Sequence, residues 1–409
     1  MTLVLRRGLA AALIVLALAP CAGAAQLPLP TRLANALAVP GSSPKTTGAV
    51  AVDLLTGRTL FARNADAPLA PASNEKLLVT YAALVELGPD YRFSTQVVST
   101  GSQDGAVWRG NLVLKGAGDP SLSSLYLLRL ATQLQKLGIT RVAGRVLGDD
   151  SWFDNLRSAP GWKPSFYLQD SAPISALVVD DGTYEHHVSA NPPLAAAARF
   201  RQMLRKRGIT TGAVGTGRAP SDATEVAHVL SPPLATILRY MDVESDNLHA
   251  EMLLKQLGAV AGTGGTTAAG AAVVTHDLED AQIPLTGVRV YDGSGLSEDD
   301  RVTARAIAAL LLAVWHSPEL RLPFFHALPV SGVSGTLKDR LDSRPAYGAV
   351  HAKTGTTDLA SALSGYVRNA FAFSVVQNGY PVSWWATRKA QDRFATALAA
   401  TQPAPGDIP

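Results

Sequence analysis

The sequence predicts an α/β (α+β) fold, in which an antiparallel sheet carries a helical cluster and a small inserted α/β domain. Strand patterns occur near both ends of the chain, and helical patterns lie between them. Residues 96–228 have a different sequence pattern, which predicts short strands and amphipathic helices. Strands from both ends are therefore expected to complete one sheet, while the middle block folds as a module of its own.

The composition is that of a globular protein of two or three domains at about 150 residues each. Of the 409 residues, 47% are hydrophobic and 17% are charged, which argues against disorder. The formal net charge of +3 is small, and Lys and Arg do not gather into runs with aromatic residues. The pattern therefore argues against nucleic-acid binding.

Residues 1–25 have the pattern of a secretory signal peptide. Arg6 and Arg7 precede an apolar stretch over 9–18, and an A-x-A-like sequence follows. The stretch is shorter than the roughly 20 residues of a transmembrane helix, so export to the periplasm is expected. Lipid attachment at Cys21, the only cysteine, is the alternative, which the proline before it disfavours.

The first part of the main domain is expected over residues 26–95. A short amphipathic helix is predicted over 29–37, and 49–65 reads as two strands around a Thr56-Gly57 turn. An almost wholly apolar helix follows, beginning at Ser73 and ending before Gly88.

The second part of the main domain is expected over residues 229–402, after the inserted domain. Its predicted helices and strands follow in order: two helices within 231–258, one helix over 303–317, strands near 349–355, 363–369 and 371–379, and a closing helix over 384–401. Residues 403–409 are expected to be a disordered tail.

Ser73 and Lys76 are the first candidate site residues. They stand three positions apart, so on a helix their side chains share one face. A serine hydroxyl needs a base to become a nucleophile, and a buried lysine can be that base because desolvation lowers its pKa. The alternative is a helix N-cap serine, and the same spacing recurs by chance at Ser42 and Lys45.

Two further triplets follow in the chain. Ser245-Asp246-Asn247 falls between two predicted helices, and Lys353-Thr354-Gly355 lies in a predicted strand. Each alone could be a cap or a turn. In this order, however, S-x-x-K, S-D-N and K-T-G are the motif set of penicillin-recognising serine enzymes.

The chain resembles the class C penicillin-binding proteins, the D-alanyl-D-alanine carboxypeptidases/endopeptidases of peptidase family S13, over most of its predicted mature length. The resemblance implies a transpeptidase-like/β-lactamase-like domain. It is carried by the three motifs and by the segments SPPLATILRYMDVESDNLHAEMLLKQLG, YDGSGLS, LPVSGVSGTLKDRL, HAKTGTTDLASALSGYV, GAGDPSL and PISALVVDDGT. Ser73 and Ser245 are 172 positions apart, which leaves room for the family's inserted module, in a reduced form.

The resemblance also implies roles for individual residues. Ser73 would be acylated with Lys76 as its base, Ser245 would relay a proton, and Asn247 would hold the substrate amide. The other implied site residues bind the substrate: Lys353, Thr354, Gly355 and Thr356, with Asp149 of the insert facing the site. A solvated turn carboxylate is the alternative for Asp149.

These observations predict a serine-type carboxypeptidase without metal or cofactor. Its expected partners are peptidoglycan stem peptides and, as covalent inhibitors, β-lactams; peripheral contact with the membrane stays open. The alternatives are a β-lactamase and a catalytically silent cell-wall-binding or penicillin-sensing protein. His186-His187 resembles a metal pair without supporting carboxylates, and Trp384-Trp385 is expected to be core or to cover the sheet.

Overall fold

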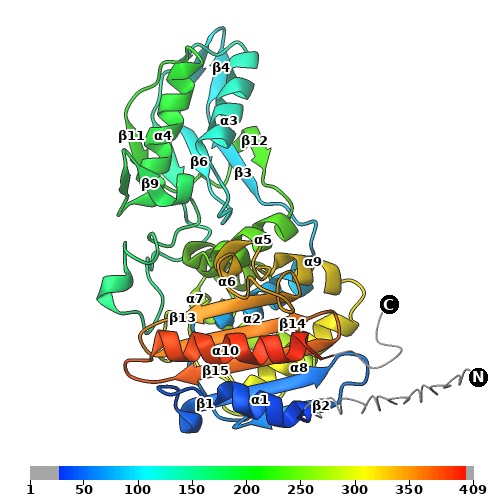
Figure 1. Ribbon diagram of the computed structural model, residues 1–409. Helices are drawn as coiled ribbons and strands as arrows, with labels where there is room; N and C mark the ends of the chain where they lie inside the picture. Colours follow the sequence, from blue (N-terminus) through cyan, green and yellow to red (C-terminus); the bar gives the residue numbers. More distant parts are fainter. Residues whose placement is uncertain (1–26, 402–409) are drawn as a thin grey trace, which may run out of the picture.

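The computed structural model describes residues 27–401 (Figure 1). The predicted signal peptide, Cys21 and the predicted tail lie outside these residues. Within 27–401, none of the helices combines the length and the apolar character that crossing a membrane requires.

The main sheet has five antiparallel strands in the order β13-β14-β15-β1-β2. Its strands are β1 (Thr47–Asp53), β2 (Thr59–Arg63), β13 (Val350–Thr356), β14 (Ala360–Val367) and β15 (Phe371–Asn378). In its centre β1 pairs with β15, with Thr47 opposite Gln377. The prediction of one antiparallel sheet built from both ends of the chain is confirmed.

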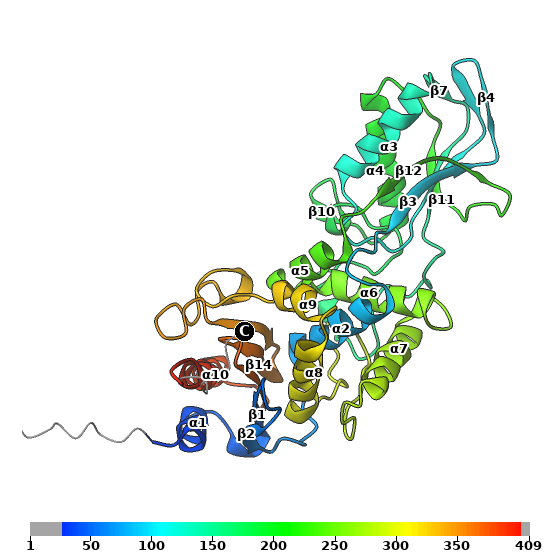
Figure 2. The same ribbon diagram turned by 90° about the vertical axis from the view of Figure 1, so that its right-hand side faces the viewer.

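Helices cover both faces of this sheet (Figures 1 and 2). One face carries α1 (Leu29–Leu37) and α10 (Trp384–Ala399), which lie side by side. The other carries α8 (Ala304–His316). Because both faces are covered, the central strands are buried along nearly their whole length.

A helical cluster packs beside the sheet. Its members are α2 (Lys76–Glu86), α5 (Leu234–Glu244), α6 (Asn247–Val260), α7 (Thr267–Asp280) and α9 (Arg321–Ala327). Helix α2 is buried from Lys76 to Leu84 and contacts every other member, as its apolar sequence predicts. Helices α7 and α9 are not predicted by the sequence, because α7 is rich in small residues with little apolar periodicity and α9 is short.

A second five-stranded sheet, β11-β8-β6-β3-β12, is formed by residues between Ser94 and Leu230. Its strands are β3 (Ser94–Ser99), β6 (Leu112–Lys115), β8 (Val146–Asp149), β11 (Val214–Thr216) and β12 (Thr224–Leu230). The remaining elements of this region are β4 (Ser102–Asp104), β5 (Val107–Arg109), β7 (Arg141–Val142), β9 (Thr183–Tyr184), β10 (His187–Val188), α3 (Ser124–Lys136) and α4 (Pro192–Lys206). Figure 1 shows this module standing above the helical cluster, with loops between β8 and α4 reaching down to it.

Candidate active site

Ser73 lies in a short 3₁₀ turn, Ala72–Glu75, which leads directly into α2. The prediction that Ser73 begins the α-helix itself was wrong by one turn, since the α-helix begins at Lys76. Strand β13 packs against the turn at Gly355, where a Cβ atom would lie 2.9 Å from the Pro71 carbonyl oxygen and 3.1 Å from the Ser73 nitrogen. Glycine is thus required for the strand to approach the serine this closely.

Lys76 connects the Ser73 turn to two other segments. Its side chain is fully buried, and Nζ lies 3.1 Å from the Oγ of Ser73. The same nitrogen donates to Oδ1 of Asn247 and to the backbone carbonyl of Ser294, each at 2.8 Å. These two acceptors can hold the two hydrogens of a neutral amine, which leaves its lone pair for the Ser73 hydroxyl proton.

The pKa of Lys76 is lowered from 10.5 to about 8, chiefly because burial disfavours the charged form. The carboxylates of Asp292, Asp246, Glu251 and Asp242 oppose this shift. A substantial fraction of Lys76 is therefore neutral at slightly alkaline pH, as a general base must be.

Lys353 is the second buried lysine of the site. Its Nζ donates to Ser245 Oγ at 2.8 Å and to the Thr354 carbonyl at 3.1 Å. Ser245 follows α5 in the left-handed conformation, with φ of +61°, and this sharp turn directs the chain into α6. Burial, with the nearby Lys76 cation, lowers the pKa of Lys353.

The turn and the two lysines lie beside one cleft of about 430 Å³. Its walls are formed by Ser73, Ser245, Thr336, Asp339, Arg340, Thr354, Gly355, Thr356 and Arg388. The structure therefore brings the three motifs together, although they are far apart in the chain. Thr336, Asp339 and Arg340 lie in the segment LPVSGVSGTLKDRL, which resembles the family but contains none of the three motifs, and nothing in the sequence pointed to Arg388.

The side-chain amide of Asn247 is held by hydrogen bonds at both its oxygen and its nitrogen. Its Oδ1 accepts from Lys76, and its Nδ2 donates to the Asp170 carbonyl at 2.8 Å. Asp170 belongs to the loop between β8 and α4, and this loop is anchored where Trp162 Nε1 donates to Asp292 Oδ2 at 2.8 Å. The loop of the upper module is thus part of the site.

Glu251 of α6 holds the segment that contacts Lys76. Its Oε1 accepts from the backbone N–H groups of Gly293, at 3.0 Å, and Ser294, at 2.8 Å. Burial first, and the Asp292 carboxylate second, raise the pKa of Glu251 to about 8. Burial thus favours the protonated form of Glu251, whose Oε1 accepts both hydrogen bonds. Sequence motifs could not reveal this contact, because it acts through a backbone carbonyl.

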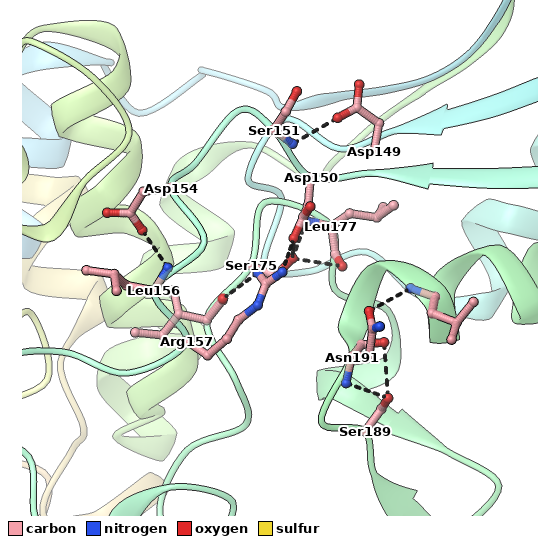
Figure 3. A network of polar contacts seen from close by, with 12 residues as sticks. Asp149, Asp150, Ser151, Asp154, Leu156, Arg157, Ser175, Leu177, Ser189 and Asn191 are labelled. Atoms are coloured by element: carbon pink, nitrogen blue, oxygen red, sulfur yellow. Dashed lines mark hydrogen bonds and ion pairs between the residues drawn. The ribbon is translucent and has the colours of Figure 1, made fainter. Parts of the chain in front are cut away.

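Asp149 does not join the other predicted site residues. At the end of β8, its two carboxylate oxygens accept from the backbone nitrogens of Ser151, at 2.9 Å, and Ala219, at 2.7 Å. It lines a different cavity, of about 670 Å³, with residues such as Trp152 and Arg218. Figure 3 shows Asp149 bonded to the Ser151 amide, away from the adjoining Asp150 network. In this structure Asp149 closes a turn and does not line the Ser73 cleft.

Comparisons with known proteins agree with this architecture. The model of the D-Ala-D-Ala carboxypeptidase 3 (S13) family matches residues 29–193 and 186–401. Carboxypeptidase Rv3627c of Mycobacterium tuberculosis is 34% identical, over 93% of this chain and 86% of its own length. D-alanyl-D-alanine carboxypeptidase of an Actinomadura species is 32% identical, over 94% and 86%.

The fold is shared with a solved structure. The crystal structure of penicillin binding protein 4 (dacB) from Haemophilus influenzae superposes with a TM-score of 0.79 at 23% identity, covering 90% of this chain and 98% of that one. The fold class predicted from the sequence is confirmed. The chain belongs to the D-Ala-D-Ala carboxypeptidase 3 (S13) family.

Proposed function

We propose that the protein is a serine-type D-Ala-D-Ala carboxypeptidase/endopeptidase that cleaves peptidoglycan stem peptides through an acyl-enzyme on Ser73. One observation carries the proposal: the fully buried amine of Lys76 lies 3.1 Å from Ser73 Oγ, beside a cleft whose wall includes Ser245, the hydrogen-bond partner of the second buried lysine, Lys353. Family membership and the names of the relatives support the reaction and the substrate.

Acylation begins with proton transfer. Neutral Lys76 takes the hydroxyl proton of Ser73 while Oγ attacks the carbonyl carbon between the two D-alanine residues. The backbone N–H groups of Ser73 and Thr356, both in the cleft wall, are proposed to stabilise the oxyanion.

The remaining groups bind the substrate and release the product. Lys353 and Thr354 bind the terminal carboxylate, and Asn247 holds the stem-peptide amide. The Ser245 hydroxyl, which accepts from Lys353, relays a proton to the leaving amine. Terminal D-alanine leaves as that nitrogen is protonated, and water then hydrolyses the ester on Ser73. A β-lactam enters by the same attack on its ring carbonyl, and the structurally similar Haemophilus protein is named a penicillin binding protein.

We also propose that residues 1–25 direct export to the periplasm, where the polymeric substrate lies. The order of two arginines, an apolar stretch and small residues supports this proposal.

Digestion of purified sacculi tests the function. Incubation with the protein should release free D-alanine, shorten pentapeptide stems and convert cross-linked muropeptides to monomers, as identified by mass. The Ser73→Ala variant should release nothing. Binding of sacculi without any product would contradict the enzyme assignment and favour a silent cell-wall-binding protein. Rapid, continuing turnover of nitrocefin without action on sacculi would indicate a β-lactamase.

A further inference from the structure

A groove of about 890 Å³ lies on the outer face of the main sheet, between α1 and α10. Its lining comprises Arg32, Ala36, Trp385, Arg388, Lys389, Asp392, Arg393, Thr396, Ala397 and Ala400. Figures 1 and 2 show the two helices side by side along this face. The groove has no role in the proposed chemistry.

The groove adjoins the catalytic cleft. Arg388 lines both of them, and its Nη2 lies 3.4 Å from Thr356 Oγ1. On the groove side, Oδ1 of Asp392 accepts from Nη2 of Arg340, a residue of the cleft wall, at 2.7 Å. A long molecule with one unit in the cleft can therefore extend along α10.

The groove is cationic. Three arginines and one lysine line it against a single acidic residue, Asp392, whose carboxylate already pairs with Arg340. Lys389 and Arg393 both project into solvent. Charge complementarity thus favours a ligand that carries several carboxylates.

Exposed aromatic side chains stand at the end of the groove that adjoins the cleft. Trp384 and Trp385 are 48% and 67% exposed, so the prediction that this pair belongs to the core was wrong, although the helix that carries the pair, α10, covers the sheet. Trp384 Nε1 donates to the Thr357 carbonyl at 3.0 Å, and the Lys389 ammonium lies 4.6 Å from the Trp385 ring centre. Tyr380, shortly before them in the chain, is 83% exposed.

We propose that this groove binds the anionic glycan–peptide polymer next to the stem peptide that is being cleaved. The proposal rests on the proposed function and names a second region for the same substrate. Stem-peptide carboxylates pair with Lys389 and Arg393, and a sugar ring lays its apolar face on Trp385. The position of the groove next to the cleft favours the polymer over a bilayer, because a chain of repeating units can reach both sites at once.

Two variants test the groove without touching the cleft: Trp385→Ala and the double variant Lys389→Glu/Arg393→Glu. The matched control, Arg205→Glu/Lys206→Glu, reverses two exposed charges at the end of α4 in the upper module. Binding to sacculi is measured by co-sedimentation in a Ser73→Ala background, so that turnover does not remove ligand. Turnover of a soluble D-Ala-D-Ala tripeptide is measured with Ser73 intact.

Each groove variant should bind sacculi about tenfold more weakly, since interface aromatic and arginine residues commonly carry effects of this size. Each groove variant should turn over the tripeptide at nearly the rate of the unaltered protein. The control variant should match the unaltered protein both in sacculus binding and in tripeptide turnover. Added salt should weaken sacculus binding of the unaltered protein more than that of the double charge variant.

Unchanged sacculus binding in both groove variants would overturn the proposal. The proposal would also be overturned if the groove variants lost binding to phosphatidylglycerol vesicles but still bound sacculi fully, because the occupant would then be an anionic membrane. Failure of the proposed function can be distinguished from failure of this proposal. In that case the protein with Ser73 intact would still bind sacculi through the groove but would release no D-alanine.

Discussion

Replacing Lys76 by methionine is expected to slow acylation of Ser73 by about 10²–10⁴-fold, the usual cost of losing a general base. Methionine fills much of the same buried space but cannot accept a proton. The Ser73 hydroxyl would then have no base within hydrogen-bonding distance among the contacts described. The acylation rate constant, measured with a fluorescent penicillin, checks this expectation.

Lys255→Met is the matched control for that variant. Lys255 is also fully buried, but its Nζ contacts Asp154 at 2.6 Å and the Leu156 carbonyl at 2.8 Å, and neither partner belongs to the cleft wall. The control should lower thermal stability and leave the acylation rate near that of the unaltered protein. Equal acylation rates in the Lys76→Met variant and the unaltered protein would remove the lysine from the mechanism.

The same base gives acylation a pH dependence of predictable sign. The neutral fraction of Lys76 rises with pH through its pKa of about 8. The acylation rate of the unaltered protein should therefore increase from pH 6, reach about half of its maximum near pH 8 and level off only above about pH 9. Lys76→Met should lose this rise. A flat profile for the unaltered protein would contradict the assigned base.

Replacing Glu251 by leucine is expected to produce the second large effect. Two buried N–H groups, of Gly293 and Ser294, would lose their acceptor, at a cost of about 1–3 kcal/mol each. The Ser294 carbonyl would no longer be held against Lys76. The acylation rate and the stability of the folded protein should therefore both fall. Glu251→Gln should keep both properties nearly intact, because glutamine is neutral and offers an acceptor oxygen at the same place.

A nearby residue separates positioning from general stability. Gln256 also lies buried on α6, but its side chain contacts Trp152 and Tyr91 on the other side. Gln256→Leu should lower the melting temperature without slowing acylation or shifting its pH profile. If Glu251→Leu changes stability alone, Glu251 has no role in positioning Lys76.

The sequence predicted those parts of the site that side-chain motifs encode. Three short motifs indicated Ser73, Ser245 and Lys353, and the structure places these residues around one cleft. Strand and helix periodicity likewise predicted the main sheet and the helices α2, α5, α6, α8 and α10. Each of these signals is local, so it can be read without knowing the fold.

The parts that the sequence could not predict depend on tertiary contacts. Ser294 reaches Lys76 through a backbone carbonyl, which any residue type carries. Arg388 enters the cleft only because α10 crosses the sheet beside β13. Trp385 appears hydrophobic in the sequence, yet the face of α10 that carries it points away from the sheet. Asp149 shared a motif with the family, but its oxygens are already bound to two backbone amides.

The central claim is that Ser73, activated by a buried lysine, is the nucleophile. Mass spectrometry after incubation with benzylpenicillin tests it most directly, with Ser42→Ala, from the second S-x-x-K sequence in the chain, as the control. The unaltered protein and the control should each gain one penicilloyl group on the peptide that contains Ser73, and Ser73→Ala should gain none. An adduct on another peptide, or equal labelling of Ser73→Ala, would contradict the claim.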